Sequence, residues 1–129
     1  MSRLQDVLDQ TAPSGVYRFH TKADTLVMRD KAAAEGWRVF YLDGTKIHSK
    51  AEFLRQAALT FEMPKYVGKN WDAFEEAIND LSWAPTRAGY LVLFDYAADF
   101  AADCQDDFAT AVSIFDAAAQ QWAAAGTPF

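Results

Sequence analysis

The sequence has one cysteine and two histidines among its 129 residues. Cys104 has no second cysteine with which to form an internal disulfide, and it stands far in sequence from His20 and His48, which makes a poor zinc site. We expect Cys104 to be a small buried or half-buried side chain. This content gives no reason to expect a metal or a cofactor.

Positive charge is also scarce. Twelve Lys and Arg residues oppose eighteen Asp and Glu residues, which gives a formal net charge of -6 and a sequence pI near 4.7. A protein of this sign is repelled by the phosphate backbone of nucleic acids. The composition therefore favours a basic protein partner over DNA or RNA.

Long apolar runs are absent as well. Residues 1–10, MSRLQDVLDQ, carry charges every few positions in place of an apolar signal region, and no later run is long and apolar enough to cross a bilayer. We therefore expect a cytoplasmic protein that does not bind membranes. Hydrophobic residues still make up 51% of the chain, which suits one globular domain over residues 1–129.

The periodicity of the first part of the chain predicts a strand, a helix and a second strand. GVYRF at residues 15–19 alternates and is rich in β-forming residues. TLVMRDKAAAEG at residues 25–36 is typical of a helix, with Asp24 as its N-cap and Gly36 as its stop. WRVFYLDG at residues 37–44 reads as a buried strand that closes on a turn, so we expect a βαβ unit.

A capped helix should follow this strand. The tetrapeptide SKAE has the spacing of a capping box, in which Ser49 accepts a hydrogen bond from the amide of Glu52 and the Glu52 side chain reaches back. The helix should extend to about Glu62, and a loop shaped by Pro64 and Gly68 should come next. Its core-facing side chains are expected to be Phe53, Leu54, Ala57, Ala58 and Phe61.

The last third of the chain predicts another strand and another helix. YLVLFDY at residues 90–96 is a buried-strand pattern, and FATAVSIFDAAAQQW at residues 108–122 is a helix that Gly126 would end. Strands that alternate with helices imply an α/β fold with a largely parallel sheet. The expected apolar stripe of this helix is Phe108, Val112, Phe115, Ala119 and Trp122.

Between the capped helix that ends near Glu62 and the helix at residues 108–122, the sequence predicts a further helix. This helix carries more negative charge than folding requires. In KYVGKNWDAFEEAIND, residues 65–80, Asn70 is the expected N-cap. One face then carries the apolar stripe Trp71, Phe74, Ile78 and Leu81. Another face carries Asp72, Glu76 and Asp80 at spacings of four, flanked by Glu75 and Asn79.

The acidic face has two interpretations. Like charges four residues apart destabilise a helix by only about 0.2–0.5 kcal/mol per pair, so a solvated face with no function is tolerable. The preceding loop favours a binding surface instead, because Tyr66 and Gly68 could display an aromatic ring beside the carboxylates. Such a surface would suit a cluster of Arg and Lys side chains.

The ordered elements around this helix resemble a known family. PKYVGKNWDAFEEAINDL, preceded by a strand ending in LDG and a capped helix, and followed by the strand YLVLF, closely resembles barstar, the intracellular inhibitor of the ribonuclease barnase. The resemblance is best over residues 37–97 and weaker through residues 108–125. It implies a barstar-like core over residues 37–125. Residues 15–36 would be the N-terminal strand and helix that are found in a longer branch of barstar-related proteins.

The resemblance also implies a function. The loop and the acidic helix would plug the basic active site of a secreted ribonuclease, one to one and without catalysis. Asp72 stands at a contact position of the family, and Glu76 stands where the family has its dominant aspartate. The resemblance implies partner contacts at Tyr66, Asn70, Asp72 and Glu76. We further expect Gly68 to shape the loop, and Glu75 and Asp80 to lie at the rim of the partner-binding surface.

The sequence departs from the family pattern at several positions. Glu76 is one methylene longer than aspartate, and Glu75 replaces a common aromatic residue. An acidic residue that the family contributes from a later helix aligns near Ala117, with Asp116 beside it on a different face. Only Gly126, Thr127, Pro128 and Phe129 follow the last predicted helix in this sequence, so we do not expect them to form the family's final strand. These differences concern the identity of the target enzyme more than the fold.

Two other functions compete with inhibition. An enzyme could use Asp72, Glu76 and Asp80 as metal ligands or as an acid and base, but no nucleophile accompanies them, and both histidines fit structural roles. A binding module of the same fold could have a basic partner that is not a nuclease. Core packing is the expected use of the four tryptophans, Trp37, Trp71, Trp83 and Trp122.

Overall fold

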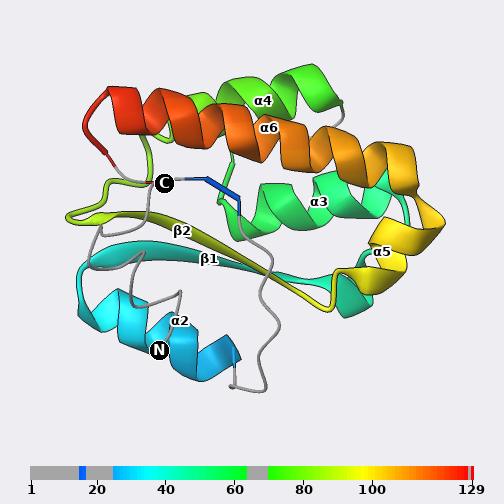
Figure 1. Cartoon of the computed structure of the whole chain (residues 1–129), viewed down its shortest axis with the longest axis horizontal. Coiled ribbons are helices and arrows are strands. Elements are labelled where there is room, and N and C mark those ends of the chain that lie inside the picture. The colour runs from blue at the N-terminus through cyan, green and yellow to red at the C-terminus, as the bar shows by residue number, and fades with distance from the viewer. Residues whose placement is uncertain (1–14, 17–24, 64–69, 128) are drawn as a thin grey trace.

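A computed structural model of the chain describes residues 15–16, 25–63, 70–127 and 129 (Figure 1). The described elements follow one another in the order α2 (Thr25–Ala34), β1 (Trp37–Asp43), the 3-10 helix η1 (Gly44–Lys46), α3 (Lys50–Thr60), α4 (Trp71–Asp80), β2 (Gly89–Asp95), α5 (Ala98–Asp103) and α6 (Gln105–Ala124).

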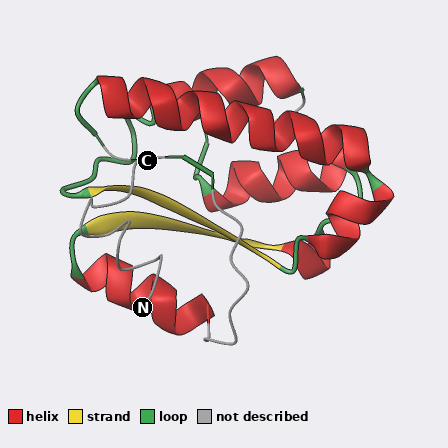
Figure 2. Ribbon diagram, in the orientation of Figure 1, coloured by secondary structure: helices red, strands yellow, loops and turns green. Residues whose placement is uncertain are grey.

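The two strands form a parallel pair at the centre of the fold. Their register runs from Trp37 opposite Gly89 to Asp43 opposite Asp95. Helix α2 covers one face of the pair, and α3, α4, α5 and α6 lie on the other side (Figure 2). The α/β fold with a parallel sheet is therefore confirmed. The strand predicted at residues 15–19 falls mostly outside the described residues.

The main core lies between the sheet and the helices α3 to α6, and its centre is aromatic. The ring of Phe53 on α3 lies 5.5 Å from that of Phe74 on α4, 5.6 Å from that of Phe100 on α5 and 6.4 Å from that of Phe115 on α6. One side chain thus joins four helices. The largest fully buried side chains are Phe53, Phe61, Phe74, Phe100, Leu42, Ile47, Ile78 and Leu81.

The N-termini of α3 and α4 have the caps that the sequence predicts. The Ser49 hydroxyl accepts a hydrogen bond from the Glu52 amide at 3.1 Å, and the Asn70 side-chain oxygen accepts one from the Ala73 amide at 2.8 Å. The Glu52 carboxylate reaches back to the amide of His48 at 2.8 Å, one residue before the cap. Both helices therefore begin at locally determined positions.

The helix ends also follow local signals. Gly36 and Gly126 follow α2 and α6 with φ angles of 94° and 89°, as expected for glycine stops. Helix α3 ends slightly before Glu62, because Glu62 takes a left-handed φ of 55°. The Met63 amide then donates to the Ala58 carbonyl at 2.9 Å and closes the end of the helix.

The region before α6 differs from the prediction. Helix α6 begins at Gln105, earlier than expected, and α5 was not predicted at all. Helix α5 has six residues and no side-chain N-cap, so it lacks both a start signal and the length for a periodic stripe. Its buried Phe100 attaches it to the core. Cys104, between the two helices, is half-buried as predicted.

The carboxyl ends of the two strands are packed closely together. A Cβ atom on Gly44 would overlap the carbonyl oxygen of Tyr96, so the backbone can approach only at glycine. The Tyr41 hydroxyl donates to the Asp95 carboxylate at 2.7 Å across the strand pair. Burial and this hydrogen bond raise the pKa of Tyr41.

Candidate functional site

Helix α4 has one buried side and one exposed side. Phe74, Ala77 and Ile78 are buried, and the edge of the Phe74 ring faces the Phe115 ring of α6 at 5.6 Å. Trp71, which was expected in the core stripe, is half-buried. The opposite side is exposed at all four acidic positions, which are Asp72, Glu75, Glu76 and Asp80.

Both ends of α4 are fixed. The Asn70 side chain caps the first turn, and the Phe74 amide donates to the Asn70 carbonyl at 3.2 Å. At the other end Leu81 has a left-handed φ of 46°, its side chain is buried, and its amide donates to the Ala77 carbonyl at 3.0 Å. The acidic side chains are therefore carried on a firmly held segment of backbone.

Within the part of the chain that the structure describes, no salt bridge neutralises this charge. The salt bridges within the described ranges join Arg29 to Asp30, Arg38 to Glu62 and Arg55 to Glu52, and none involves α4. Lys50 at the start of α3 places its ammonium nitrogen 5.9 Å from the centroid of the Trp71 ring. The sequence could not predict this contact between Lys50 and Trp71, because the two residues lie far apart in the chain.

Small polar contacts occur along the acidic side. The Asn79 amide nitrogen donates to the Glu75 carbonyl at 3.0 Å, and the Ser82 hydroxyl donates to the Asp80 carboxylate at 3.3 Å. Both contacts are local, so they hold side chains near the helix without removing negative charge. The carboxylates therefore remain available to positively charged side chains of a partner.

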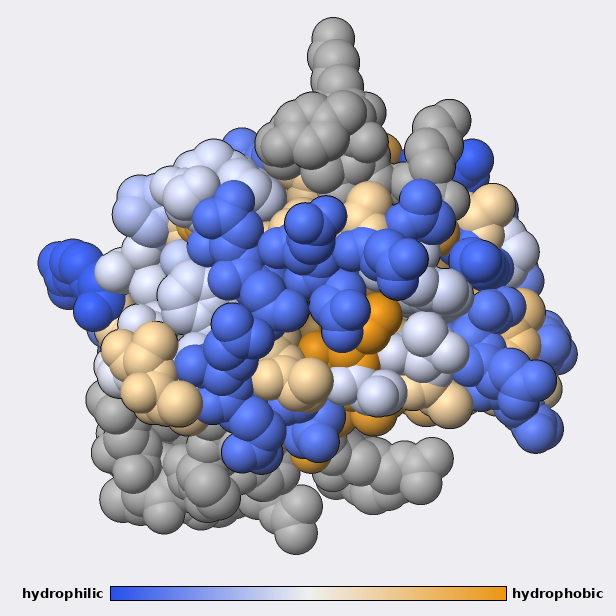
Figure 3. All heavy atoms as spheres, turned by 90° about the horizontal axis from the view of Figure 1, so that it is seen from above, coloured by the Kyte–Doolittle hydropathy of each residue, from blue (hydrophilic) through white to orange (hydrophobic). Residues whose placement is uncertain are grey.

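Helix α6 lies beside α4 and contributes to the same side of the molecule. Seen from above, hydrophilic residues are prominent on this face, and an apolar area shows between them near its centre (Figure 3). Asp116 and Ala117, the positions expected near the family's later acidic contact, are both exposed on α6. The surface so described is acidic and polar.

The structure thus describes five of the seven predicted binding residues. It places Asp72, Glu75, Glu76 and Asp80 on the exposed side of one helix, and Asn70 at the start of that helix. Tyr66 and Gly68 lie outside the described residues, so their part in the surface stays a prediction. Pro64 lies outside them too.

Metal-ligating groups and His48 are the features that bear on the rival enzyme function. Among them, no group of three or more His, Cys, Asp or Glu side chains is arranged to hold a metal ion. His48 is exposed, and its ring nitrogen Nε2 lies 3.0 Å from the Thr45 carbonyl oxygen. None of the helices in the described ranges is long and apolar enough to span a membrane.

Together these features define an α/β protein with a parallel strand pair and an exposed acidic helix. A family model described as Barstar (barnase inhibitor) matches residues 37–129, and the chain belongs to the Barstar family. The match begins at β1, so α2 precedes the matched region. Searches of curated proteins and of solved structures gave no match. Membership in a family of inhibitors indicates a non-catalytic protein.

Proposed function

We propose that the chain inhibits a small ribonuclease by covering its basic active site with residues 64–69 and helix α4. The observation that carries the proposal is the exposed acidic side of α4, which faces away from a buried aromatic side in a chain that belongs to the Barstar family. A site built to bind RNA phosphates presents Arg and Lys side chains, and carboxylates at matching positions would occupy it.

The fixed ends of α4 favour this use. Carboxylates that enter an interface lose their hydration, and this loss is offset only where positive groups meet them with good geometry. A helix held at Asn70 and Leu81 has little freedom to lose on binding, so more of the interaction remains as affinity. The negative face should also speed the first encounter with a basic protein.

The departures from the family bear on which enzyme is inhibited. Glu76 extends one methylene further than aspartate, and Glu75 replaces an aromatic contact with a charge. We therefore infer a target whose pocket differs from that of barnase. Residues 37–125 would form the inhibitor core, and residues 15–36 would be an N-terminal extension whose helix α2 lies on the other face of the sheet. A cytoplasmic location belongs to this proposal, since the inhibitor would protect RNA inside the cell.

The proposal is tested by calorimetric titration against a panel of small basic ribonucleases that includes barnase, with RNA cleavage followed in parallel. The wild type is compared with the Asp72→Ala, Glu76→Ala double variant. The control is Asp30→Ala, Glu35→Ala, which removes the same charge from exposed positions at α2. We expect binding that abolishes cleavage and that only the α4 double variant loses.

Two results would contradict the proposal. Equal losses in both double variants would show that net charge alone is responsible, and not the face of α4. A partner that binds this face and still cleaves RNA would indicate the alternative, an acidic binding module of the same fold whose partner is not inhibited.

A further inference from the structure

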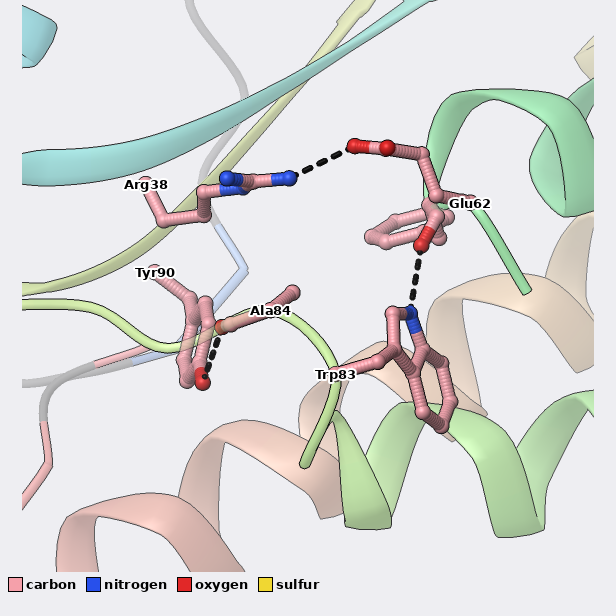
Figure 4. Close-up of polar contacts among 6 residues, drawn as sticks. Arg38, Glu62, Trp83, Ala84 and Tyr90 are labelled. Carbon is pink, nitrogen blue, oxygen red and sulfur yellow. Dashed lines mark hydrogen bonds and ion pairs between the residues drawn. The ribbon is translucent and has the colours of Figure 1, made fainter. Parts of the chain in front are cut away.

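A hydrogen bond closes the segment that carries the proposed binding residues. The indole nitrogen of Trp83 donates to the Phe61 carbonyl oxygen at 2.8 Å (Figure 4). Phe61 follows the end of α3, and Trp83 comes two residues after Leu81, the C-cap of α4. Every residue that we propose to contact the partner lies between these two bonded residues.

An ion pair holds the same end of α3 to the sheet. The Arg38 guanidinium on β1 contacts the Glu62 carboxylate at 2.6 Å (Figure 4). It also lies 5.6 Å from the centroid of the Phe40 ring. Glu62 keeps the left-handed backbone that a residue other than glycine adopts reluctantly. The contact therefore joins β1 to the residue at which the chain leaves α3.

A third contact holds the chain where it leaves α4. The buried Tyr90 hydroxyl donates to the Ala84 carbonyl at 2.7 Å, and the Ala84 amide donates to the Leu81 carbonyl at 3.0 Å. Tyr90 on β2 stands opposite Arg38 on β1 in the strand register. One pair of facing strand residues therefore anchors both ends of the segment.

We propose that Trp83 is a positioning residue for partner binding, and that Trp83, Arg38, Glu62 and Tyr90 form a clamp that holds helix α4 in position to bind. The proposal rests on the inhibitor function proposed above. Joining the ends of a segment removes conformational freedom that binding would otherwise have to remove. The hydrogen-bond donor at Trp83 is the indole N–H, a group that phenylalanine lacks.

Core packing alone is the competing explanation for Trp83, and Trp122 provides the matched control. The Trp122 indole nitrogen also donates to a backbone carbonyl, that of Ile78, at 2.9 Å, and both rings are partly buried against the main core. Trp83→Phe and Trp122→Phe therefore remove the same kind of bond. Only Trp83→Phe breaks the hydrogen bond that joins Phe61, at the end of α3, to the chain that follows α4.

The first measurement needs no partner. Hydrogen exchange is compared in the two variants at Met63 and Ala73, whose amides flank residues 64–69 and are hydrogen-bonded to Ala58 and Asn70. We expect exchange at both amides to be about fivefold faster in Trp83→Phe, as for the loss of one hydrogen bond, and nearly unchanged in Trp122→Phe.

The second measurement uses the ribonuclease of the panel that the wild type binds. Trp83→Phe should raise Kd about fivefold, and Trp122→Phe should change it less than about twofold. The effect of Trp83→Phe should shrink when Asp72 alone is already alanine, a background in which binding is weakened but still measurable, because a positioning residue acts through the acidic side chains of α4. A residue that only stabilises the fold would give the same factor in both backgrounds.

Glu62→Gln provides a second variant in case Trp83→Phe does not fold. The Glu62 side chain is 66% exposed, and an exposed ion pair adds little to stability, so a change in Kd would not come from unfolding. We expect Glu62→Gln to weaken binding in the same direction.

The outcomes distinguish failure of the proposed clamp from failure of the proposed inhibitor function. Exchange that stays at the wild-type rate in Trp83→Phe overturns the clamp, whether or not any ribonuclease binds. Faster exchange with an unchanged Kd overturns its link to binding, and so does equal weakening by Trp122→Phe. Faster exchange in a protein that binds no ribonuclease supports the clamp and contradicts the inhibitor function.

Discussion

The side-chain oxygen of Asn70 accepts the amide hydrogen of Ala73 at 2.8 Å, so a residue at a proposed contact position also starts the helix that carries the acidic side chains. The two roles use different atoms. The cap uses the side-chain oxygen. Asn70 is exposed at the edge of the acidic surface, so its side-chain nitrogen is left as a donor for the proposed partner contact.

These two roles can be separated by substitution. Asn70→Ala removes the cap and should lower the free energy of unfolding by about 1 kcal/mol, whereas Asn70→Ser keeps a capping oxygen and should lower it far less. Urea denaturation of the two variants measures the difference. If Asn70 also contacts the partner, Asn70→Ser will restore stability but not affinity. Equal stability of both variants would show that the cap contributes nothing.

The acidic residues of α4 should matter for binding and not for folding. Asp72→Ala and Glu76→Ala each relieve repulsion between like charges one turn apart, so the free energy of unfolding should stay the same or rise by about 0.2–0.5 kcal/mol. Affinity for the partner should fall in both variants. Thermal denaturation beside calorimetric titration tests both parts, and a large loss of stability in either variant would argue against an interface role.

Association with the basic partner should slow steeply as salt is added. Ions screen the field that the exposed acidic face produces, while a contact made mainly by apolar groups would be nearly insensitive. Stopped-flow association rates between low and physiological salt measure the dependence. A flat profile would point to an apolar contact surface in place of α4.

Gly44 should tolerate no side chain. A Cβ atom at this position would overlap backbone atoms of Asp95 and Tyr96, which cannot move without disturbing β2, so Gly44→Ala should cost about 2–3 kcal/mol. Gly126→Ala serves as the control, because the space around Gly126 is open and only its positive φ opposes the change. Its cost should be about 1–2 kcal/mol. Denaturant titration that ranks the two in the opposite order would contradict the close approach.

Alkaline pH should destabilise the fold through Tyr41. Burial, aided by the hydrogen bond to Asp95, raises the pKa of Tyr41 above its ordinary value near 10. Because the folded state holds the proton more tightly, its stabilising effect is complete below pH 10 and is lost as pH rises toward the folded-state pKa. The free energy of unfolding should therefore fall above about pH 10, and less steeply in Tyr41→Phe. Identical slopes in the two proteins would contradict this role.

Much of the fold follows from signals that are local in sequence. The caps at Ser49 and Asn70 and the glycine stops at Gly36 and Gly126 operate within a few residues, and the structure has them where the sequence predicts them. The family assignment has the same origin, because the motif and the elements around it are contiguous. The acidic side of α4 also follows from spacing, since helical geometry places the apolar residues on the opposite side.

Other features depend on residues that are remote in sequence. Helix α5 is too short to carry a periodic pattern and exists because Phe100 is buried against Phe53. Trp71 packs against the core, as its place on the apolar stripe predicts, but how deeply it is buried depends on the helices that pack around it.

By itself, the sequence determined where α3 and α4 begin, which side of α4 is apolar, and to which family the chain belongs. Only the tertiary structure decided that Trp83 meets Phe61, that Arg38 meets Glu62, and that Gly44 passes against Tyr96. The physical reason is that capping and periodicity act within one or two turns of the chain, whereas these contacts exist only once the strand register has brought distant segments together.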